Sequence, residues 1–202
     1  CGKTTTIGMI LGLLKPSSGK VLINGNEIEL KRVELLDNIN FISPYIELPK
    51  KLTVKQNLEV YGRLYDIKNI KLKIKDISEK LRLDEIINKI TGELSSGQKN
   101  RVSLAKSIIN DPKVLLLDEP TASLDPETGD FVRSFLEDYQ KEKGASILLA
   151  SHNMAEVKRL CSSVLMMNNG VIIDQGSPSK LIERHGRKNM EEVFLKLARK
   201  TI

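Results

Sequence analysis

Two short apolar runs, residues 114–117 and 147–150, constrain the fold of this chain more than any other feature. Each is strand-sized and lacks the alternation of a half-exposed strand, which is typical of parallel strands that are buried on both faces. The first run continues directly into Asp118 and Glu119. Because ligand sites in parallel α/β sheets lie at the carboxyl ends of strands, this pattern predicts an α/β fold with both carboxylates at that edge.

Composition excludes several classes of protein. No apolar run approaches the ~20 residues that cross a bilayer, and no charged start precedes an apolar segment, so nothing suggests secretion. The two cysteines, Cys1 and Cys161, form no disulfide framework, which fits a reducing cytosolic setting. The formal net charge of +6 could indicate a surface that binds nucleic acid or an anionic membrane. Since the basic residues do not interleave with aromatic ones and Trp is absent, a solvated surface is the favoured interpretation, and no nucleic-acid partner is expected.

The first residues, CGKTTT, match the end of a phosphate-binding loop. In the pattern G-x-x-x-x-G-K-[ST], Gly2, Lys3 and Thr4 hold the last three positions. The earlier positions would precede Cys1, so we expect that the chain lacks its natural N-terminus. Gly2 lets the backbone approach phosphate oxygens, and Lys3 places a positive charge against the β and γ phosphates. The Thr4 hydroxyl can coordinate magnesium, and Thr5 can donate from its hydroxyl and its backbone N–H to a phosphate.

A buried helix is predicted directly after this loop, because apolar residues recur there at helical spacing. Its N-terminus would favour anions. We expect Pro16 and Gly19 to end it. The apolar positions are Ile7, Ile10, Leu11 and Leu14.

The two carboxylates after the apolar strand suit complementary roles. Asp118 can hold magnesium, usually through water, and Glu119 can polarise an attacking water, since a general base must lie within hydrogen-bond reach of that water. A strand that ends in a surface acidic turn is the ordinary alternative. The Lys3–Thr4 pair far upstream favours the functional interpretation, because the two motifs form complementary halves of one magnesium–phosphate site.

Residues 94–98, LSSGQ, resemble the LSGGQ signature of ATP-binding-cassette (ABC) ATPases, with Ser96 in place of the usual first Gly. Ser95 and Gln98 also have the spacing of a capping box that opens a helix, with Gly97 in its first turn. A well-capped helix and nothing more is therefore the alternative. Two observations favour the signature: KVLLLDEPTASLD follows at the short distance that the family requires, and an open helix N-terminus is a natural seat for a γ-phosphate. The inward positions of this helix are Val102, Leu104, Ala105, Ile108 and Ile109.

Further family marks follow in order. Asp125 matches the D-loop and has the position of a helix N-cap, with Pro126 in the first turn. His152, after the strand at 146–150, matches the histidine that contacts the γ-phosphate, whereas His185 is interpreted as structural. Asn169-Gly170 predicts a hairpin turn between two strands, and Ser177-Pro178 the start of a helix.

One departure from the family is plain. A Gln usually follows the strand at 39–43, but the expected position falls at or near Pro44, which has no side-chain ligand to offer. Ser43, Glu47 or a water must then take the place of this Gln at the magnesium, or the coupling to the membrane partner is weaker. We therefore assign no residue to this role. Gln56 instead pairs with Thr53 as a capping box. The aromatic residue that stacks on adenine in the family would lie upstream of residue 1.

The resemblance covers essentially the whole chain and implies a P-loop NTPase (RecA-like) α/β core with an inserted helical subdomain. The core comprises residues 1–44 and 97–180, the helical subdomain 45–96 and the C-terminal helix 181–202. Helices are expected at 54–65, 71–81, 84–89 and 190–199. The implied ligands are ATP and Mg²⁺, held by residues 1–5 (Cys1, Gly2, Lys3, Thr4 and Thr5) and by Asp118.

The resemblance also implies a head-to-tail dimer with a second ABC ATPase domain. Residues 95–98 and Asp125 of this chain would then complete the nucleotide site of that second domain. Glu119 activates water and His152 steadies the γ-phosphate. The chain would be peripheral on the cytoplasmic face of the cell membrane, bound to an integral membrane permease. The segments 42–65 and 189–200 resemble the exporter branch.

Two alternatives stay open. A relative that acts in translation or DNA maintenance is one, although residues 5–93 carry neither heptads nor zinc-ligand cysteines, which disfavours repair proteins. A degenerate cassette that binds ATP without cleaving it is the other; Glu119 and His152 argue against it.

Overall fold

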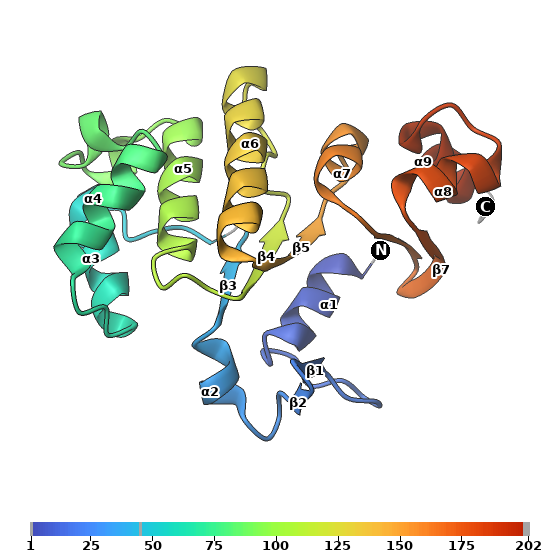
Figure 1. Ribbon diagram of the computed structural model, residues 1–202, viewed down its shortest axis with the longest axis horizontal. Helices are drawn as coiled ribbons and strands as arrows, with labels where there is room; N and C mark the ends of the chain where they lie inside the picture. Colours follow the sequence, from blue (N-terminus) through green and yellow to red (C-terminus); the bar gives the residue numbers. More distant parts are fainter. Residues whose placement is uncertain (1, 45, 200–202) are drawn as a thin grey trace.

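A three-stranded parallel sheet forms the centre of the molecule. The computed structural model describes residues 2–44 and 46–199. The strand order is β3-β4-β5, and the register pairs Ile39 with Val114 and Asp118 with Ala150. Figure 1 shows α1 on one side of this sheet and α5, α6 and α7 on the other. The bounds are β3 Ile39–Ile42, β4 Val114–Asp118, β5 Ser146–Ala150, α1 Lys3–Ile10, α5 Ser96–Ser107, α6 Pro126–Lys143 and α7 Met154–Leu160.

The two apolar runs differ in burial. The interior residues of β4 are buried, as expected for the middle strand. In β5, however, only Ala150 is buried, and Leu148 is 38% exposed. The prediction of a fully buried strand is therefore wrong for β5, because within the described residues it pairs with β4 alone and its other edge is open.

A helical subdomain leads from β3 to α5 and shares one hydrophobic core with the sheet, in which Leu58, Ile77, Leu104 and Leu115 are buried. Thr53 and Gln56 form the expected capping box. The helix expected at 84–89 is only a short 3-10 turn, since the carbonyls of Ile87 and Lys89 accept hydrogen bonds from the first amides of α3 instead. The bounds are α3 Val54–Leu64, α4 Ile70–Lys80, η1 Asp84–Ile86 and η2 Thr91–Glu93.

The helix α1 is shorter than the sequence suggested. It ends at Ile10, well before Pro16, because Gly12 adopts a left-handed backbone with φ 64° and the Leu13 amide bonds back to the Gly8 carbonyl. Ile7 and Leu11 are buried, but Leu14 is 49% exposed and does not belong to the buried face. Short strands β1 (Leu22–Ile23) and β2 (Asn26–Glu27) and helix α2 (Arg32–Leu36) lead on to β3.

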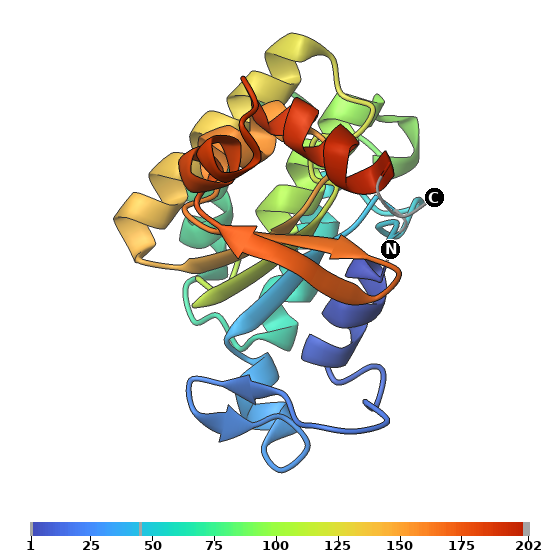
Figure 2. The same ribbon diagram turned by 90° about the vertical axis from the view of Figure 1, so that its right-hand side faces the viewer.

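The C-terminal part is a hairpin followed by two helices, which Figure 2 shows from the end of the molecule. Asn169 and Gly170 both have positive φ, 47° and 80°, so the Asn-Gly turn is confirmed. Ser177 caps the next helix, also as predicted. Met166, Leu181, Met190 and Val193 form the small core of this part. The bounds are β6 Val164–Asn168, β7 Val171–Gly176, α8 Pro178–His185 and α9 Met190–Arg199.

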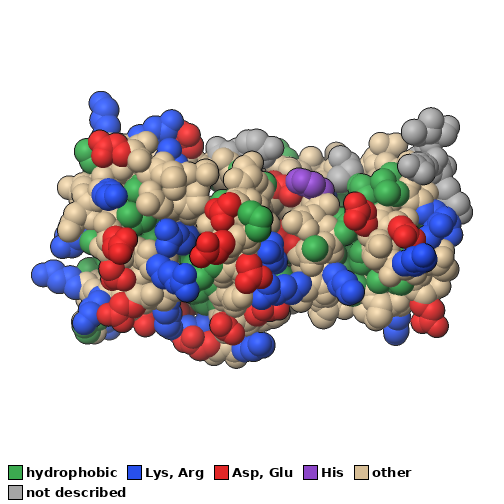
Figure 3. Space-filling view, turned by 90° about the horizontal axis from the view of Figure 1, so that it is seen from above, with side chains coloured by type: hydrophobic (Ala, Val, Ile, Leu, Met, Phe, Trp, Pro, Cys, Tyr) green, Lys and Arg blue, Asp and Glu red, His purple; other side chains and the backbone are tan. Residues whose placement is uncertain are grey.

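The surface carries mixed charge. On the face drawn in Figure 3, basic side chains are interspersed with acidic ones and do not gather into one patch. Several pairs link the helices, among them Arg159 with Asp130 and Glu137. This distribution supports a solvated surface as the source of the net positive charge.

Candidate functional site

The carboxyl end of β4 lies against the N-terminus of α1. Asp118, the last residue of β4, is 2% exposed, and its Oδ2 accepts a hydrogen bond of 3.0 Å from the Thr4 hydroxyl. Sheet pairing places Asp118 opposite Ala150, the last residue of β5. The sheet thus brings the first residues of the chain to the predicted edge.

Glu119 occupies the centre of the cluster. Its backbone has a left-handed φ of 52°, and its amide donates to the Ala150 carbonyl at 2.8 Å. Lys3 Nζ lies 3.3 Å from Oε1, whereas His152 Nδ1 lies 2.7 Å from Oε2. The two carboxylate oxygens therefore have different partners, and three segments far apart in the sequence meet at one side chain.

The electrostatics of Glu119 follow from these partners. Burial by itself would raise the pKa of this carboxyl. The hydrogen bond from His152 and the charge of Lys3 act in the opposite direction and together outweigh burial, so the pKa lies below its ordinary value. Glu119 is therefore a carboxylate at neutral pH and can only accept hydrogen bonds, so Nδ1 of His152 must carry the proton that it donates.

The N-terminus of α1 is open. Its N-cap, Gly2, has φ 101° and offers no side chain to the first amides of the helix. A Cβ at Gly2 would lie 3.2 Å from the Cα of Gly170 in the β6–β7 turn, so both conformation and space require glycine here. Such an uncapped terminus with a lysine beside it is suited to an anion. Thr5 is exposed in the first turn, and Cys1 lies outside the described residues.

A cavity of about 310 Å³ opens beside Glu119. It lies between the segment after β3 and the N-terminal half of α5. Ser43, Pro44 and Glu47, the segment that lacks the expected Gln, all line it. Ser96 of the signature-like segment and Ser123 line it as well.

The remaining signature residues lie apart from the Lys3–Glu119 cluster. Ser95 and Gln98 form the reciprocal capping box of α5, with bonds of 3.0 and 3.3 Å. A Cβ at Gly97 would come within 3.3 Å of Thr128 in α6. Asp125 caps α6 through the Thr128 amide at 2.9 Å. Both predicted N-caps are confirmed, and within one chain these residues form a separate surface.

Sequence reasoning missed one buried carboxylate. Glu156 in α7 is 1% exposed and accepts hydrogen bonds from Thr121 and Ser151. Its signal in the sequence was weak, a charged residue four positions after His152 with Val157, also buried, beside it. Acidic residues in the first turn of a helix are ordinarily explained by their favourable interaction with the helix dipole. A carboxylate with another role is therefore hard to recognise there from the sequence.

The arrangement defines a class of protein. A lysine and a hydroxyl at an open helix N-terminus, facing two carboxylates at the end of a parallel strand, are typical of P-loop nucleoside triphosphatases. Comparison with known proteins narrows the class: a family model described as ABC transporter matches residues 1–122. The chain belongs to the ABC transporter family. ATP-binding subunits of this family are ATPases that are coupled to transport.

Similar proteins and structures agree with this assignment. The chain is 34% identical to the ABC transporter ATP-binding protein NatA of Bacillus subtilis (strain 168), over 96% of this chain and 80% of that protein. A solved structure of cbiO1 from Clostridium perfringens, described as part of the ABC transporter complex cbiONQ, matches with a TM-score of 0.79 at 32% identity, covering 98% of this chain and 80% of that one. An ATP binding subunit of an ABC transporter, 23% identical, has the same fold, with a TM-score of 0.87 over 98% of this chain and 83% of its own.

A further relative is longer than this chain. The chain is 34% identical to the Nod factor export ATP-binding protein I of Rhizobium sp. (strain N33), over 96% of its own length but only 64% of that protein. These relatives favour transport over the alternative in translation or DNA maintenance. Within residues 2–44 and 46–199, no helix is both long and apolar enough to span a bilayer.

Proposed function

We propose that this chain binds ATP with magnesium and hydrolyses it as the ATPase subunit of an exporter. The observation that carries the proposal is Glu119, held between Lys3 and His152 beside the Asp118–Thr4 pair. A cationic helix terminus for phosphates and a carboxylate base for water then lie within one site. Export is supported by the name of the Nod factor relative and by the resemblance of segments 42–65 and 189–200.

The phosphates would lie on the N-terminus of α1, contacted by Gly2, Lys3, Thr4 and Thr5, with Cys1 just before them. The Thr4 hydroxyl and the Asp118 carboxylate suit magnesium, which prefers oxygen ligands and takes the rest from phosphates and water. In the described part of the chain, no cluster of three or more His, Cys, Asp or Glu residues could hold a metal. When bound, magnesium would neutralise charge that develops on the phosphates.

Hydrolysis assigns a role to each partner of Glu119. The carboxylate accepts a proton from the attacking water, and its lowered pKa keeps it unprotonated and ready at neutral pH. His152, whose side chain is 71% exposed, can keep Nδ1 on Glu119 while its other ring nitrogen, Nε2, faces the γ-phosphate. Lys3 leaves the carboxylate for the phosphates, which are the stronger anion.

The domain layout supports a second copy in the reaction. Residues 1–44 and 97–180 would form the nucleotide-binding core, 45–96 the helical subdomain and 181–202 the C-terminal helix. Ser95, Gly97, Gln98 and Asp125 lie apart from the Lys3–Glu119 cluster in this chain. Together with Ser96, they would meet the nucleotide of a second ATPase domain packed head to tail. The partner of the pair would be an integral membrane permease, with this chain peripheral on the cytoplasmic face.

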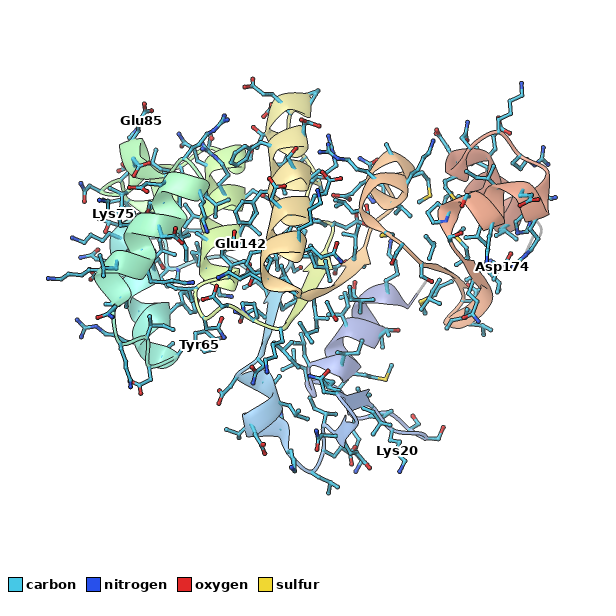
Figure 4. All side chains as sticks on the ribbon, viewed as in Figure 1. Lys20, Tyr65, Lys75, Glu85, Glu142 and Asp174 are labelled. Carbon is cyan, nitrogen blue, oxygen red and sulfur yellow. The ribbon has the colours of Figure 1, made fainter. Side chains whose placement is uncertain are left out.

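Substitution of Glu119 by Gln tests the assignment. Gln keeps the shape but cannot take a proton, so hydrolysis by the full chain with its membrane partner should fall by about 10²–10⁴-fold, the usual contribution of a general base. ATP should still bind and hold a dimer, seen by size-exclusion chromatography. Glu85→Gln is the matched control, because Glu85 is exposed and points away from the body in Figure 4. Wild-type hydrolysis by Glu119→Gln would refute the assignment, and purification with ribosomes or DNA instead of a membrane protein would refute transport.

A further inference from the structure

Glu156 is a buried carboxylate that the proposed reaction does not use. It lies in α7 with 1% of its surface exposed. Its Oε1 accepts a hydrogen bond from the Thr121 hydroxyl at 2.9 Å, and its Oε2 accepts one from the Ser151 hydroxyl at 2.6 Å. In the described part of the chain, no Lys, Arg or His forms an ion pair with it. A buried carboxylate without a cation costs free energy, which hydrogen bonds to both oxygens offset in part.

The two hydroxyls belong to the loops that carry the reacting side chains. Thr121 lies two residues after Glu119, and Ser151 lies immediately before His152. The bond from the Glu119 amide to the Ala150 carbonyl follows the last paired residues of β4 and β5. Beyond that bond the pairing of β4 and β5 ends, and Glu156 links the two following loops through Thr121 and Ser151.

The position of Glu156 is itself fixed. Asn153 caps α7 by accepting hydrogen bonds from the amides of Ala155 and Glu156, at 3.1 and 3.2 Å. The Asn153 amide in turn donates to the Ser151 hydroxyl at 3.0 Å, which directs the hydroxyl proton toward Glu156. The carboxylate therefore belongs to the capped N-terminus of α7, which limits its movement with either loop.

We infer that Glu156 is a positioning residue for hydrolysis, which holds the loops after β4 and β5 so that His152 stays in contact with Glu119. This inference rests on the proposed function. Glu156 itself touches neither the nucleotide site nor the water, so it acts only through Thr121 and Ser151. Its removal should alter the catalytic step while the phosphate contacts of Lys3 and Thr4 remain.

The Glu156→Gln variant of the full chain tests the inference. One amide nitrogen would then face a hydroxyl in place of an accepting oxygen. That hydroxyl must turn from donor to acceptor and the charge-assisted hydrogen bonds are lost, so the bridge is weakened. We expect kcat to fall about 10- to 100-fold, since displacements near 1 Å at a reacting group cost that much. The KM for ATP should change less than about two-fold, because ground-state contacts persist. Glu183→Gln, an exposed carboxylate of α8, is the matched control.

A double-mutant cycle separates positioning from a merely structural role. In the Glu119→Gln background, Glu156→Gln should lower single-turnover hydrolysis by less than about two-fold, because the residue that it positions is already absent. A merely structural role would lower hydrolysis by the same factor in both backgrounds. A lower melting temperature with multiplicative effects on hydrolysis would overturn the inference.

A second variant decides the case if Glu156→Gln does not fold. Ser151→Ala removes one hydroxyl only and should give a smaller loss of kcat, with the KM for ATP again changed less than about two-fold. An unchanged kcat in Ser151→Ala, or an equal loss in the Glu119→Gln background, would overturn the inference. Full activity of Glu119→Gln would instead refute the proposed function, so the two failures are distinguishable.

Discussion

Substitutions at Ser95 can separate two roles that the sequence left entangled, a helix cap and a phosphate contact in trans. The Ser95 hydroxyl accepts the Gln98 amide at 3.3 Å, while Gln98 Oε1 accepts the Ser95 amide at 3.0 Å. Ser95→Ala removes the hydroxyl, and loss of such a cap costs about 1 kcal/mol. For a chain of this size, about 1 kcal/mol corresponds to a fall of about 2–4 °C in Tm.

Ser95→Asp has the opposite pattern. Asp caps helices as well as Ser does, so the Tm should stay within about 1 °C of the wild type. A new carboxylate about 4 Å from the γ-phosphate of a partner domain would add about 4 kcal/mol of repulsion per unit charge at an effective dielectric constant near 20. That energy corresponds to about a thousand-fold loss of hydrolysis.

Thermal unfolding and steady-state ATPase activity of both variants check the argument. Ser95→Ala should lower Tm, and Ser95→Asp should abolish hydrolysis with Tm retained. Wild-type hydrolysis by Ser95→Asp would refute the contact in trans and leave only a capped helix. An unchanged Tm in Ser95→Ala would refute the capping energy.

Two further predictions concern the ends of the chain. Gly2→Ala should lower the free energy of unfolding by about 1–2 kcal/mol and weaken ATP binding, because φ 101° disfavours a Cβ and Gly170 lies 3.2 Å from it; an unchanged Kd for ATP by calorimetry would contradict this. Asp174, labelled in Figure 4, accepts hydrogen bonds from His185 and Arg184, and the bond from His185 is the largest cause that keeps its pKa below the usual value. Its contribution to stability is therefore present above that value and is lost as pH falls through the lowered pKa, so the Tm difference between wild type and Asp174→Asn should shrink below about pH 4. A difference that stays constant between pH 3 and 7 would contradict it.

Local signals in the sequence predicted much of the fold. The capping boxes at Thr53 and Ser95, the N-caps at Asp125 and Ser177 and the Asn-Gly turn are each decided by neighbouring residues, and all are confirmed. Val102, Leu104 and Ala105 of α5 are buried as predicted, since a helix period fixes which side chains share a face. Ile108 and Ile109 are buried as well, but they lie just beyond the end of α5 at Ser107, so the predicted helix was too long.

Features that depend on distant partners could not be predicted. The carbonyls of Ile87 and Lys89 bond to α3, so the expected helix at 84–89 does not form. Burial of β5 depends on a neighbour on its second edge, which no local pattern reveals. The meeting of Lys3 with the strand end at Glu119 was predicted from the two motifs, and the place of His152 from the family resemblance, whereas the bridge at Glu156 requires coordinates.

The contacts of Glu119 also suggest why nucleotide binding and readiness for catalysis go together. Lys3 neutralises the carboxylate in this structure, but in the proposed reaction the same ammonium must contact the phosphates. Its departure frees Oε1 of Glu119, which can then accept a proton from water. The carboxylate is therefore available as a base only when the triphosphate is present, while His152 still contacts Oε2. In such a site the catalytic base stays paired with Lys3 until the phosphates of ATP bind the lysine. Hydrolysis is thereby coupled to the presence of the nucleotide.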